Sequence, residues 1–411
     1  MPEFLELLPP AAALDKLLAH LPPPALLSET IDTASALGRV LKNQVLAQEP
    51  LPAFARSTVD GYALRAADTY GASESLPAYL PVVGEVPMGA APQFALQPGA
   101  AASIHTGGML PPGADAVLML EYSQVSRPGE LEVLRAVGAG ENILKVGEDV
   151  AIGQEVLPSG VRLRPAEIGG LMALGLKEIE VIRRPRIGII SSGDEVVQPN
   201  QAVRPGQVRD INSYSLSALV TQAGAEPVRY GIVADQAAAL DAALRMALAE
   251  CDLVLVTAGS SASARDLTAD VVNRMGQPGV LVHGVNVKPG KPTILAVCDG
   301  KAVIGLPGNP VSALVIARIF LMPVIGKLSG LTMEHSRPIT RARLTVNLAS
   351  QAGREDYFPV KLVSTPEGLI ADPIFYKSNL IFMLARADGL VRIPSDATGL
   401  GAGMIVDVEY L

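Results

Sequence analysis

The chain has 411 residues, of which 49% are hydrophobic and 18% charged, and it contains no tryptophan. This composition is typical of several compact globular domains and argues against a disordered protein. The formal net charge of −8 argues against a nucleic-acid partner, which normally requires a basic surface. The two cysteines suit a reducing compartment, the longest apolar runs have the length of strands, and no secretory signal opens the chain. We therefore expect a cytoplasmic protein without a membrane partner.

The first predicted unit is a helical linker domain made of residues 1–50 together with residues 147–184. Leucines recur at helical spacing from Leu14 to Leu21, before three prolines interrupt the pattern. Asp32 is a suitable N-cap for a second helix that ends at Leu41. A further helix is expected from Ala166 to Leu174, packed with the early helices.

Residues 51–146 are expected to form a β-rich module inserted into this linker. The segment is rich in glycine and proline and contains short apolar runs such as Ala116–Leu120. Residues 337–411 return to alternating polar and apolar positions, with turn residues at intervals of about ten. This pattern predicts a small antiparallel β-barrel at the C-terminus.

Between these parts, residues 185–330 alternate apolar strands with amphipathic helices. The first expected strand is Arg186–Ile190, and Asn212 and Asp235 are suitable caps for the helices that follow the first two strands. The pattern predicts a mainly parallel sheet covered by helices on both faces, a three-layer α/β/α domain. Such sheets bind ligands at the carboxyl ends of their strands. The expected fold class is therefore multidomain α/β plus β.

Three strand ends of this domain lead into loops suited to phosphate. They are Ser191–Glu195, Thr257–Asp266 and Leu306–Pro310. Small residues let backbone amides approach an anion, and a helix N-terminus favours negative charge. Any one loop is as readily an ordinary turn, but three at one edge favour an anion site. Lys288-Pro-Gly-Lys-Pro292 is then better interpreted as an anion clamp than as a solvated turn.

Two acidic turns lie outside the expected sheet, in Ser57–Ala63 and in Gly147–Asp149. An Asp-Gly turn is often only structural. Carboxylates facing a phosphate ligand, however, indicate a hard divalent cation such as Mg²⁺. The four histidines are scattered, so the sequence contains no zinc-ligand spacing.

Taken in order, these motifs resemble those of the molybdopterin molybdenumtransferase family, which includes the E domain of gephyrin. The resemblance spans nearly the whole chain and rests on a set of short motifs: Leu37-Gly-Arg39, Ser57-Thr-Val-Asp-Gly-Tyr62, Thr106-Gly107, Glu121, Gly147-Glu-Asp149, Ser192-Gly-Asp-Glu195, Arg209-Asp-Ile-Asn-Ser213, Asp235, Gly259 to Asp266, Lys288-Pro-Gly-Lys-Pro292 and Leu306-Pro-Gly-Asn-Pro-Val-Ser312. The combination is specific, although each piece alone is not.

The resemblance implies an elongated homodimer that binds adenylated molybdopterin and inserts molybdate or tungstate into its dithiolene. It also implies Mg²⁺-dependent release of AMP, and an upstream molybdopterin adenylyltransferase as partner. Acidic residues of one subunit's β module would complete a cleft on the α/β domain of the other. Carboxylates would hold Mg²⁺ and orient water, while lysines would attract the oxyanion and stabilise the leaving phosphate.

The same resemblance assigns site residues by matching position. The expected catalytic residues are Asp60, Asp149, Asp235, Asp266, Lys288 and Lys291, with Asp60 and Asp266 as the Mg²⁺ ligands. The residues expected to contact the adenylated pterin are Thr106, Ser192, Gly193, Asp194, Glu195, Asn212, Gly259, Ser260, Ser261, Pro307, Gly308, Asn309 and Pro310.

The chain departs from the usual family pattern at three positions. Ala264 stands at a customary acidic position, Ser263 at a customary glycine, and Gly284 where many members carry a second lysine. These changes leave the choice between molybdate and tungstate open.

Two other interpretations stay open. One is an enzyme like molybdopterin adenylyltransferase, although that family resembles only the α/β domain. The other is a catalytically silent dimeric scaffold of the same fold, which the altered loop before Asp266 favours and the retained carboxylates oppose.

Overall fold

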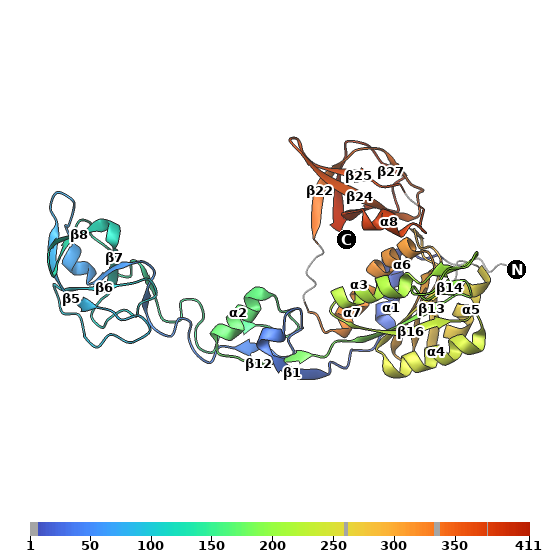
Figure 1. Ribbon diagram of the computed structural model, residues 1–411, viewed down its shortest axis with the longest axis horizontal. Helices are drawn as coiled ribbons and strands as arrows, with labels where there is room; N and C mark the ends of the chain where they lie inside the picture. The colour runs from blue at the N-terminus through green and yellow to red at the C-terminus, as the bar shows by residue number, and fades with distance from the viewer. Residues whose placement is uncertain (1–6, 259–261, 333–337, 376) are drawn as a thin grey trace.

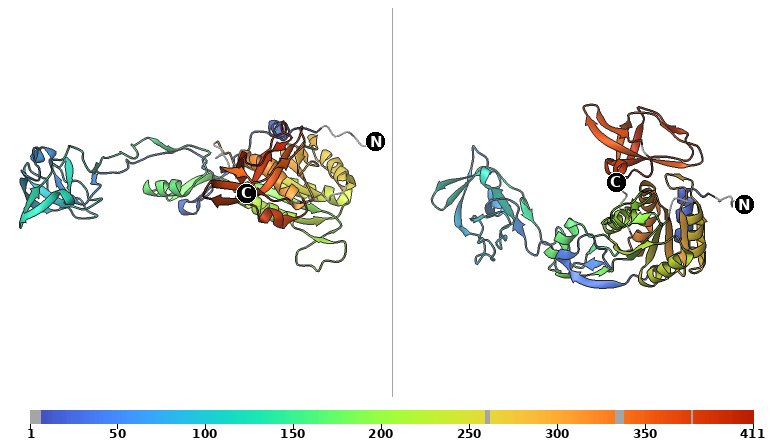
Figure 2. Two further views of the ribbon diagram at one scale, coloured as in Figure 1. Left: turned by 90° about the horizontal axis from the view of Figure 1, so that it is seen from above. Right: turned by 45° about the vertical axis from the view of Figure 1, so that its right-hand side comes forward.

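The computed structural model describes residues 7–258, 262–332, 338–375 and 377–411. The molecule is elongated and bent, with a β module at one end and an α/β domain at the other (Figure 1). A narrow linker joins the two, and a C-terminal β domain lies beside the α/β domain (Figure 2). The expected class, multidomain α/β plus β, is confirmed.

The α/β domain is built on a six-stranded sheet whose strands are buried along most of their length. In spatial order these are β16 (Glu226–Val233), β13 (Arg186–Ser192), β17 (Leu253–Ala258), β21 (Lys301–Pro307), β20 (Ile294–Cys298) and β18 (Pro278–His283). The first four pair in parallel, and only β20 runs against its neighbours. The predicted, mainly parallel sheet is thus confirmed, and its carboxyl edge is where ligands are expected.

Helices cover both faces of this sheet. One face carries α1 (Pro10–His20), α3 (Asn212–Gln222) and the continuous run α6 (Pro310–Ile316), η4 (Ala317–Leu321) and α7 (Met322–Leu328). The other face carries α4 (Ala237–Glu250) and α5 (Ala262–Asn273). The helix α1 was expected in the linker domain, but its Ala13 and Leu17 are fully buried in the α/β core. The grouping of this helix with the linker was wrong, since its apolar stripe packs on the sheet.

The run Pro310–Leu328 is long and apolar enough to cross a membrane by length and composition. In this structure it is a core helix, because Phe320, Leu321 and Val324 are fully buried against the sheet.

The linker contains more strand than the sequence predicted. β1 (Ser28–Asp32) pairs with β12 (Glu178–Ile182), and β2 (Val45–Leu46) pairs with β11 (Glu155–Leu157). Asp32 caps a helix as expected, by accepting a hydrogen bond from Ala34 N, but that helix is only the three-residue η1 (Thr33–Ser35). The predicted continuation to Leu41 is wrong, because Gly38 has a left-handed backbone and the next residues bridge to other segments.

The helix α2 (Pro165–Ala173) is confirmed, and its first turn offers a pH-dependent test. Hydrogen bonds from the Arg164 side chain and backbone lower the pKa of Glu167 to about 2, from an ordinary 4.5. A depressed folded pKa stabilises the fold above about pH 4.5, and this stabilisation is lost as the pH falls toward 2. We expect Glu167→Gln to show a shallower fall in the free energy of unfolding across this window, measured by urea denaturation. Glu178→Gln, at an exposed position of β12, is the control; a slope in Glu167→Gln as steep as in wild type would contradict the assignment.

The inserted module is β-rich, as predicted. Its six-stranded sheet has the order β7 (Ala116–Met119), β4 (Gly61–Leu64), β6 (Ala101–Ile104), β5 (Ala78–Glu85), β9 (Glu130–Val133) and β8 (Ser123–Arg127). Two short 3₁₀ helices, η2 (Ala66–Thr69) and η3 (Leu120–Tyr122), connect its strands. A separate pair, β3 (Arg56–Ser57) and β10 (Ile143–Leu144), lies where the module joins the linker.

The C-terminal domain is a small closed barrel with one short helix, α8 (Ile381–Ala385). Its strands are β22 (Ile339–Leu344), β24 (Glu355–Thr365), β25 (Gly368–Pro373), β26 (Gly389–Ile393) and β28 (Ile405–Tyr410), with the short pair β23 (Leu348–Ala349) and β27 (Gly399–Leu400). Pairing of β24 with β26 closes the barrel. The expectation of a wholly antiparallel barrel needs correction, because β22 and β25 pair in parallel.

Two short strands attach loops of the α/β domain. β14 (Val196–Val197) pairs with β15 (Val208–Arg209) beside the end of β13. β19 (Val287–Lys288) pairs in parallel with β24 of the barrel. The second pairing fastens the C-terminal domain to the loop that carries the lysine motif.

Candidate functional site

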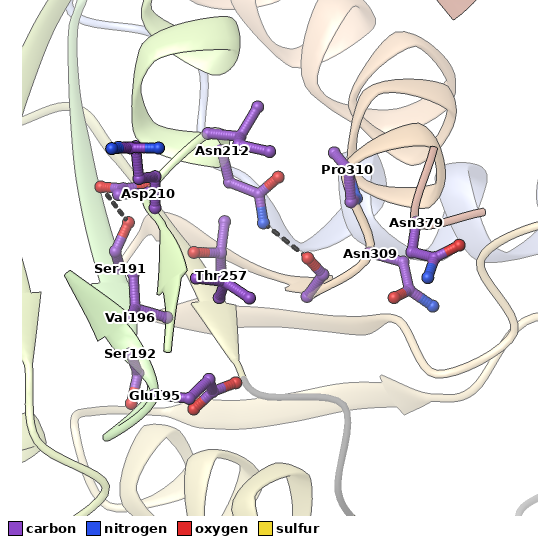
Figure 3. Close-up of a pocket in the computed structure, with 14 residues that line it drawn as sticks. Ser191, Ser192, Glu195, Val196, Asp210, Asn212, Thr257, Asn309, Pro310 and Asn379 are labelled. Atoms are coloured by element: carbon purple, nitrogen blue, oxygen red, sulfur yellow. Dashed lines mark hydrogen bonds between the residues drawn. The ribbon is translucent and has the colours of Figure 1, made fainter. Parts of the chain in front are cut away.

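A cavity of about 250 Å³ lies at the carboxyl edge of the parallel sheet (Figure 3). Ser191, Ser192 and Thr257 reach it from the ends of β13 and β17. Glu195 lines it from the loop after β13, and Asn212 from the first residue of α3. Gly308 and Asn309 line it from the loop before α6, and Pro310 from the start of that helix. Six of the thirteen residues expected to contact the ligand, including the end of the third predicted phosphate loop, therefore meet around one cavity.

Asp210 organises one wall of this cavity, although the sequence analysis included it in a motif without assigning it a role. Its carboxylate is almost fully buried and accepts hydrogen bonds from Ser191 Oγ (3.0 Å), Ser213 N (3.0 Å) and Ser213 Oγ. These bonds fix the end of β13 to the start of α3. An aspartate three residues before a serine at a helix start is a capping signal, which could have identified Asp210.

Asn212 provides an unsatisfied acceptor at the cavity wall. Its Nδ2 donates a hydrogen bond to Gly308 O (2.8 Å), so α3 is joined to the loop before α6 (Figure 3). Its Oδ1 is buried and has no hydrogen-bond partner within the part of the chain that the structure describes. Buried acceptors are nearly always paired in proteins, so this oxygen is suited to a donor on a ligand.

The other acidic residues of this edge form a chain behind the cavity. Ser192 Oγ donates to Asp235 Oδ1 (2.5 Å), and Asp235 N donates to Asp194 Oδ1 (3.1 Å). Asp235 therefore does not line the cavity itself but is hydrogen-bonded to Ser192, which does, whereas Glu195 lines the cavity directly. Gly193, between them, has a left-handed backbone, and a Cβ there would lie 2.7 Å from Glu195 Oε2.

A second cavity, of about 460 Å³, adjoins the first and contains the lysine motif. Lys288 and Lys291 line it from the α/β domain, and Arg354 and Asp356 line it from the barrel. Asn309 lines both cavities. The lysines were expected in one cleft with Glu195, but they lie on the far side of Asn309, because β19 is drawn toward the barrel by its pairing with β24.

Arg354 and Asp356 were missed by the sequence interpretation. Alternating strands in the tail predicted a barrel, but nothing local indicated that this barrel faces the sheet edge. Ser312 and Pro307 also line the second cavity, so the Leu306–Ser312 segment contributes to both cavities.

The distal acidic residues lie in the linker and the β module, away from the sheet edge in a single chain (Figure 1). Asp60 Oδ1 accepts hydrogen bonds from Thr106 N (2.8 Å) and Thr106 Oγ1 (3.2 Å). The backbone bond from Thr106 is the main cause of a lowered pKa for Asp60, so this exposed carboxylate is charged at neutral pH. Asp149 is also exposed, in a loop bound to Leu51 O. One chain therefore does not bring these residues to the cavities.

Part of the expected site lies outside the described residues, namely Gly259, Ser260 and Ser261. Asp266 follows them in α5 and is exposed. Within the ranges that the structure describes, no three His, Cys, Asp or Glu side chains gather in a way that could hold a metal ion.

Comparison with known proteins finds similarity over almost the whole chain. Residues 8–175 match the MoeA N-terminal region (domain I and II), residues 188–327 match a probable molybdopterin binding domain, and residues 341–411 match the MoeA C-terminal region (domain IV).

Individual relatives agree with these matches. A molybdopterin molybdenumtransferase from Nostoc sp. is 34% identical, with 93% of this chain and 89% of the relative covered. Molybdopterin molybdenumtransferase 2 from Mycobacterium tuberculosis is 35% identical, with 92% and 94% covered. Among solved structures, the molybdopterin biosynthesis moeA protein from Pyrococcus horikoshii OT3 has a TM-score of 0.85 at 31% identity, with 99% and 100% covered.

Proposed function

The chain belongs to the molybdopterin molybdenumtransferase family, a family of transferases of molybdenum cofactor biosynthesis, and from that premise we propose its reaction. The protein binds adenylated molybdopterin, releases AMP, and inserts molybdate or tungstate into the pterin dithiolene. It acts as a homodimer in the cytoplasm, on substrate supplied by a molybdopterin adenylyltransferase.

The unsatisfied Oδ1 of Asn212 is the observation that carries this proposal. It is a buried acceptor on a residue that lines a cavity at the carboxyl edge of a parallel sheet, where such folds bind nucleotide-like ligands. Pterin and adenine rings both present N–H donors, and either would satisfy this oxygen. Gly308 lines the cavity just before α6, and its lack of a side chain lets a phosphate approach the backbone there.

The second cavity suits the oxyanion. Lys288, Lys291 and Arg354 each carry a positive charge, and Asp356 carries the opposing negative charge. Together these side chains leave two positive charges, which match a tetrahedral dianion such as molybdate or tungstate. Since Asn309 lines both cavities, an oxyanion held here lies next to the ligand of the first cavity.

The chemistry of the acidic residues fits the metal expected for this reaction. Asp60 and Asp266 are exposed, and carboxylate oxygens are the ligands that Mg²⁺ prefers. When bound, Mg²⁺ would neutralise charge on the phosphate oxygens. Because the β module and the linker, which carry Asp60, Thr106 and Asp149, lie away from the α/β domain of their own chain, we propose that these residues reach the cavities of the partner subunit (Figure 1).

An AMP-release assay tests the proposal. Purified protein is incubated with adenylated molybdopterin, molybdate and MgCl₂, and AMP is quantified by chromatography. We expect release that requires both molybdate and Mg²⁺, and competition between molybdate and tungstate then identifies the preferred oxyanion. Absence of AMP release from folded, dimeric protein with bound substrate would favour the silent-scaffold interpretation instead.

A further inference from the structure

Arg354 is held in the second cavity by a buried carboxylate. It lies immediately before β24, and its side chain is partly exposed. Arg354 Nε donates to Asp356 Oδ1 (2.6 Å), and Arg354 Nη2 donates to Asp356 Oδ2 (3.0 Å). The Asp356 side chain is only 1% exposed, so its position is fixed by the barrel.

The pairing of β19 with β24 places this carboxylate opposite the lysine loop. Lys288 is aligned with Asp356 in the parallel register, and Glu355 N donates to Asn286 O (3.1 Å). The barrel thereby presents Arg354 to the same cavity that Lys288 and Lys291 line from the α/β domain.

The geometry of this pair leaves part of the guanidinium available. A carboxylate that accepts from Nε and Nη2 leaves Nη1 uncommitted by this contact, and the Arg354 side chain lines the cavity. A free arginine side chain would lose rotamer freedom when it binds an anion, whereas one held beforehand loses less. At metal sites, carboxylates likewise orient the side chains that bind the metal and thereby raise the affinity for it.

We propose that Asp356 is a positioning residue that sets the affinity of the oxyanion cavity by holding Arg354 in its binding orientation. This inference rests on the proposed function, which places the oxyanion in this cavity. The positioning effect of Asp356 acts through Arg354, so this gain in affinity disappears when Arg354 is absent, whereas the negative charge of Asp356 by itself opposes anion binding in either background.

Equilibrium dialysis of sodium molybdate against the full-length protein tests this role without turnover. We expect Asp356→Asn to raise the Kd for molybdate roughly 10- to 100-fold. In an Arg354→Ala background the same change should not raise the Kd further, because coupled residues are not additive. A purely structural defect would instead weaken both backgrounds equally. Asp356→Glu keeps the carboxylate and should recover part of the affinity.

Asp372→Asn is the matched control, since exposed Asp372 lies in the same barrel, lines neither cavity and accepts a hydrogen bond from Thr345. It should leave the Kd unchanged. Unaltered affinity in Asp356→Asn, or equal losses in the two backgrounds, would overturn the positioning role. Should Asp356→Asn fail to fold, Asp356→Glu in both backgrounds gives the same comparison. Molybdate binding that Arg354→Ala leaves intact would instead refute the oxyanion assignment itself, and with it part of the proposed function.

Discussion

Two inactive variants, Asp60→Ala and Asp266→Ala, should regain roughly a quarter of the wild-type AMP-release activity when their subunits are mixed. Each variant alone should lose about 100- to 1000-fold, because each lacks a carboxylate of the proposed metal site. Asp60 belongs to the β module and Asp266 to α5, and these two parts lie at opposite ends of the molecule (Figure 1). If one cleft uses Asp60 of one subunit and Asp266 of the other, a mixed dimer contains one intact cleft and one doubly altered cleft. Random mixing makes half of the dimers mixed, which gives the expected fraction.

The measurement requires proof that subunits exchange. Differently tagged variants can be unfolded together, refolded and purified through both tags, so that only mixed dimers are assayed. Those dimers should have about half of the wild-type activity. A mixture of Asp60→Ala with Thr106→Ala is the matched control, because both changes lie in one module and no intact cleft can form. Mixed dimers as inactive as the parents would show that the cleft is not shared.

Removal of both lysines of the second cavity should raise the KM for molybdate about 100-fold. A charged hydrogen bond contributes about 1.5–3 kcal/mol, so each lysine accounts for tenfold or more. The variant Lys288→Ala/Lys291→Ala keeps the first cavity, so the KM for adenylated molybdopterin should change much less. Both constants are obtained from initial rates of AMP release with one substrate varied.

Lys361→Ala is a suitable control, because Lys361 is exposed on β24 and lines neither cavity. Equal increases in the KM of both substrates would contradict a separate oxyanion cavity. Such a result would indicate that the lysines act in one cleft together with Glu195, as the sequence interpretation expected.

The α/β domain could be predicted because its signals are local. Runs such as Leu253–Val256 are buried on both faces of the sheet, and so they are apolar throughout rather than alternating. The linker was harder to predict, because its structure depends on contacts between residues that are distant in sequence. Asp32 has the correct capping chemistry, yet the helix ends after one turn, because Gly38 has a left-handed backbone and Val40 and Leu41 bridge to distant residues.

The candidate site divides in the same way. Residues that follow strands, such as Glu195 and Asn309, could be placed at the sheet edge from their position in sequence. Arg354 and Asp356 could not, because their approach depends on how two domains dock through β19 and β24. Asp210 was within reach of sequence analysis, but its capping role was not recognised.

The attachment of β19 to the barrel has a consequence for synthesis on the ribosome. A nascent chain that has emerged only as far as α7 holds every strand of the α/β sheet and most of the first cavity, but it lacks β24 and therefore Arg354. On the proposed assignments, such a chain has the cavity for a nucleotide-like ligand but not the completed cavity for the oxyanion. We therefore expect the proposed reaction to require translation of the C-terminal barrel, which supplies Arg354.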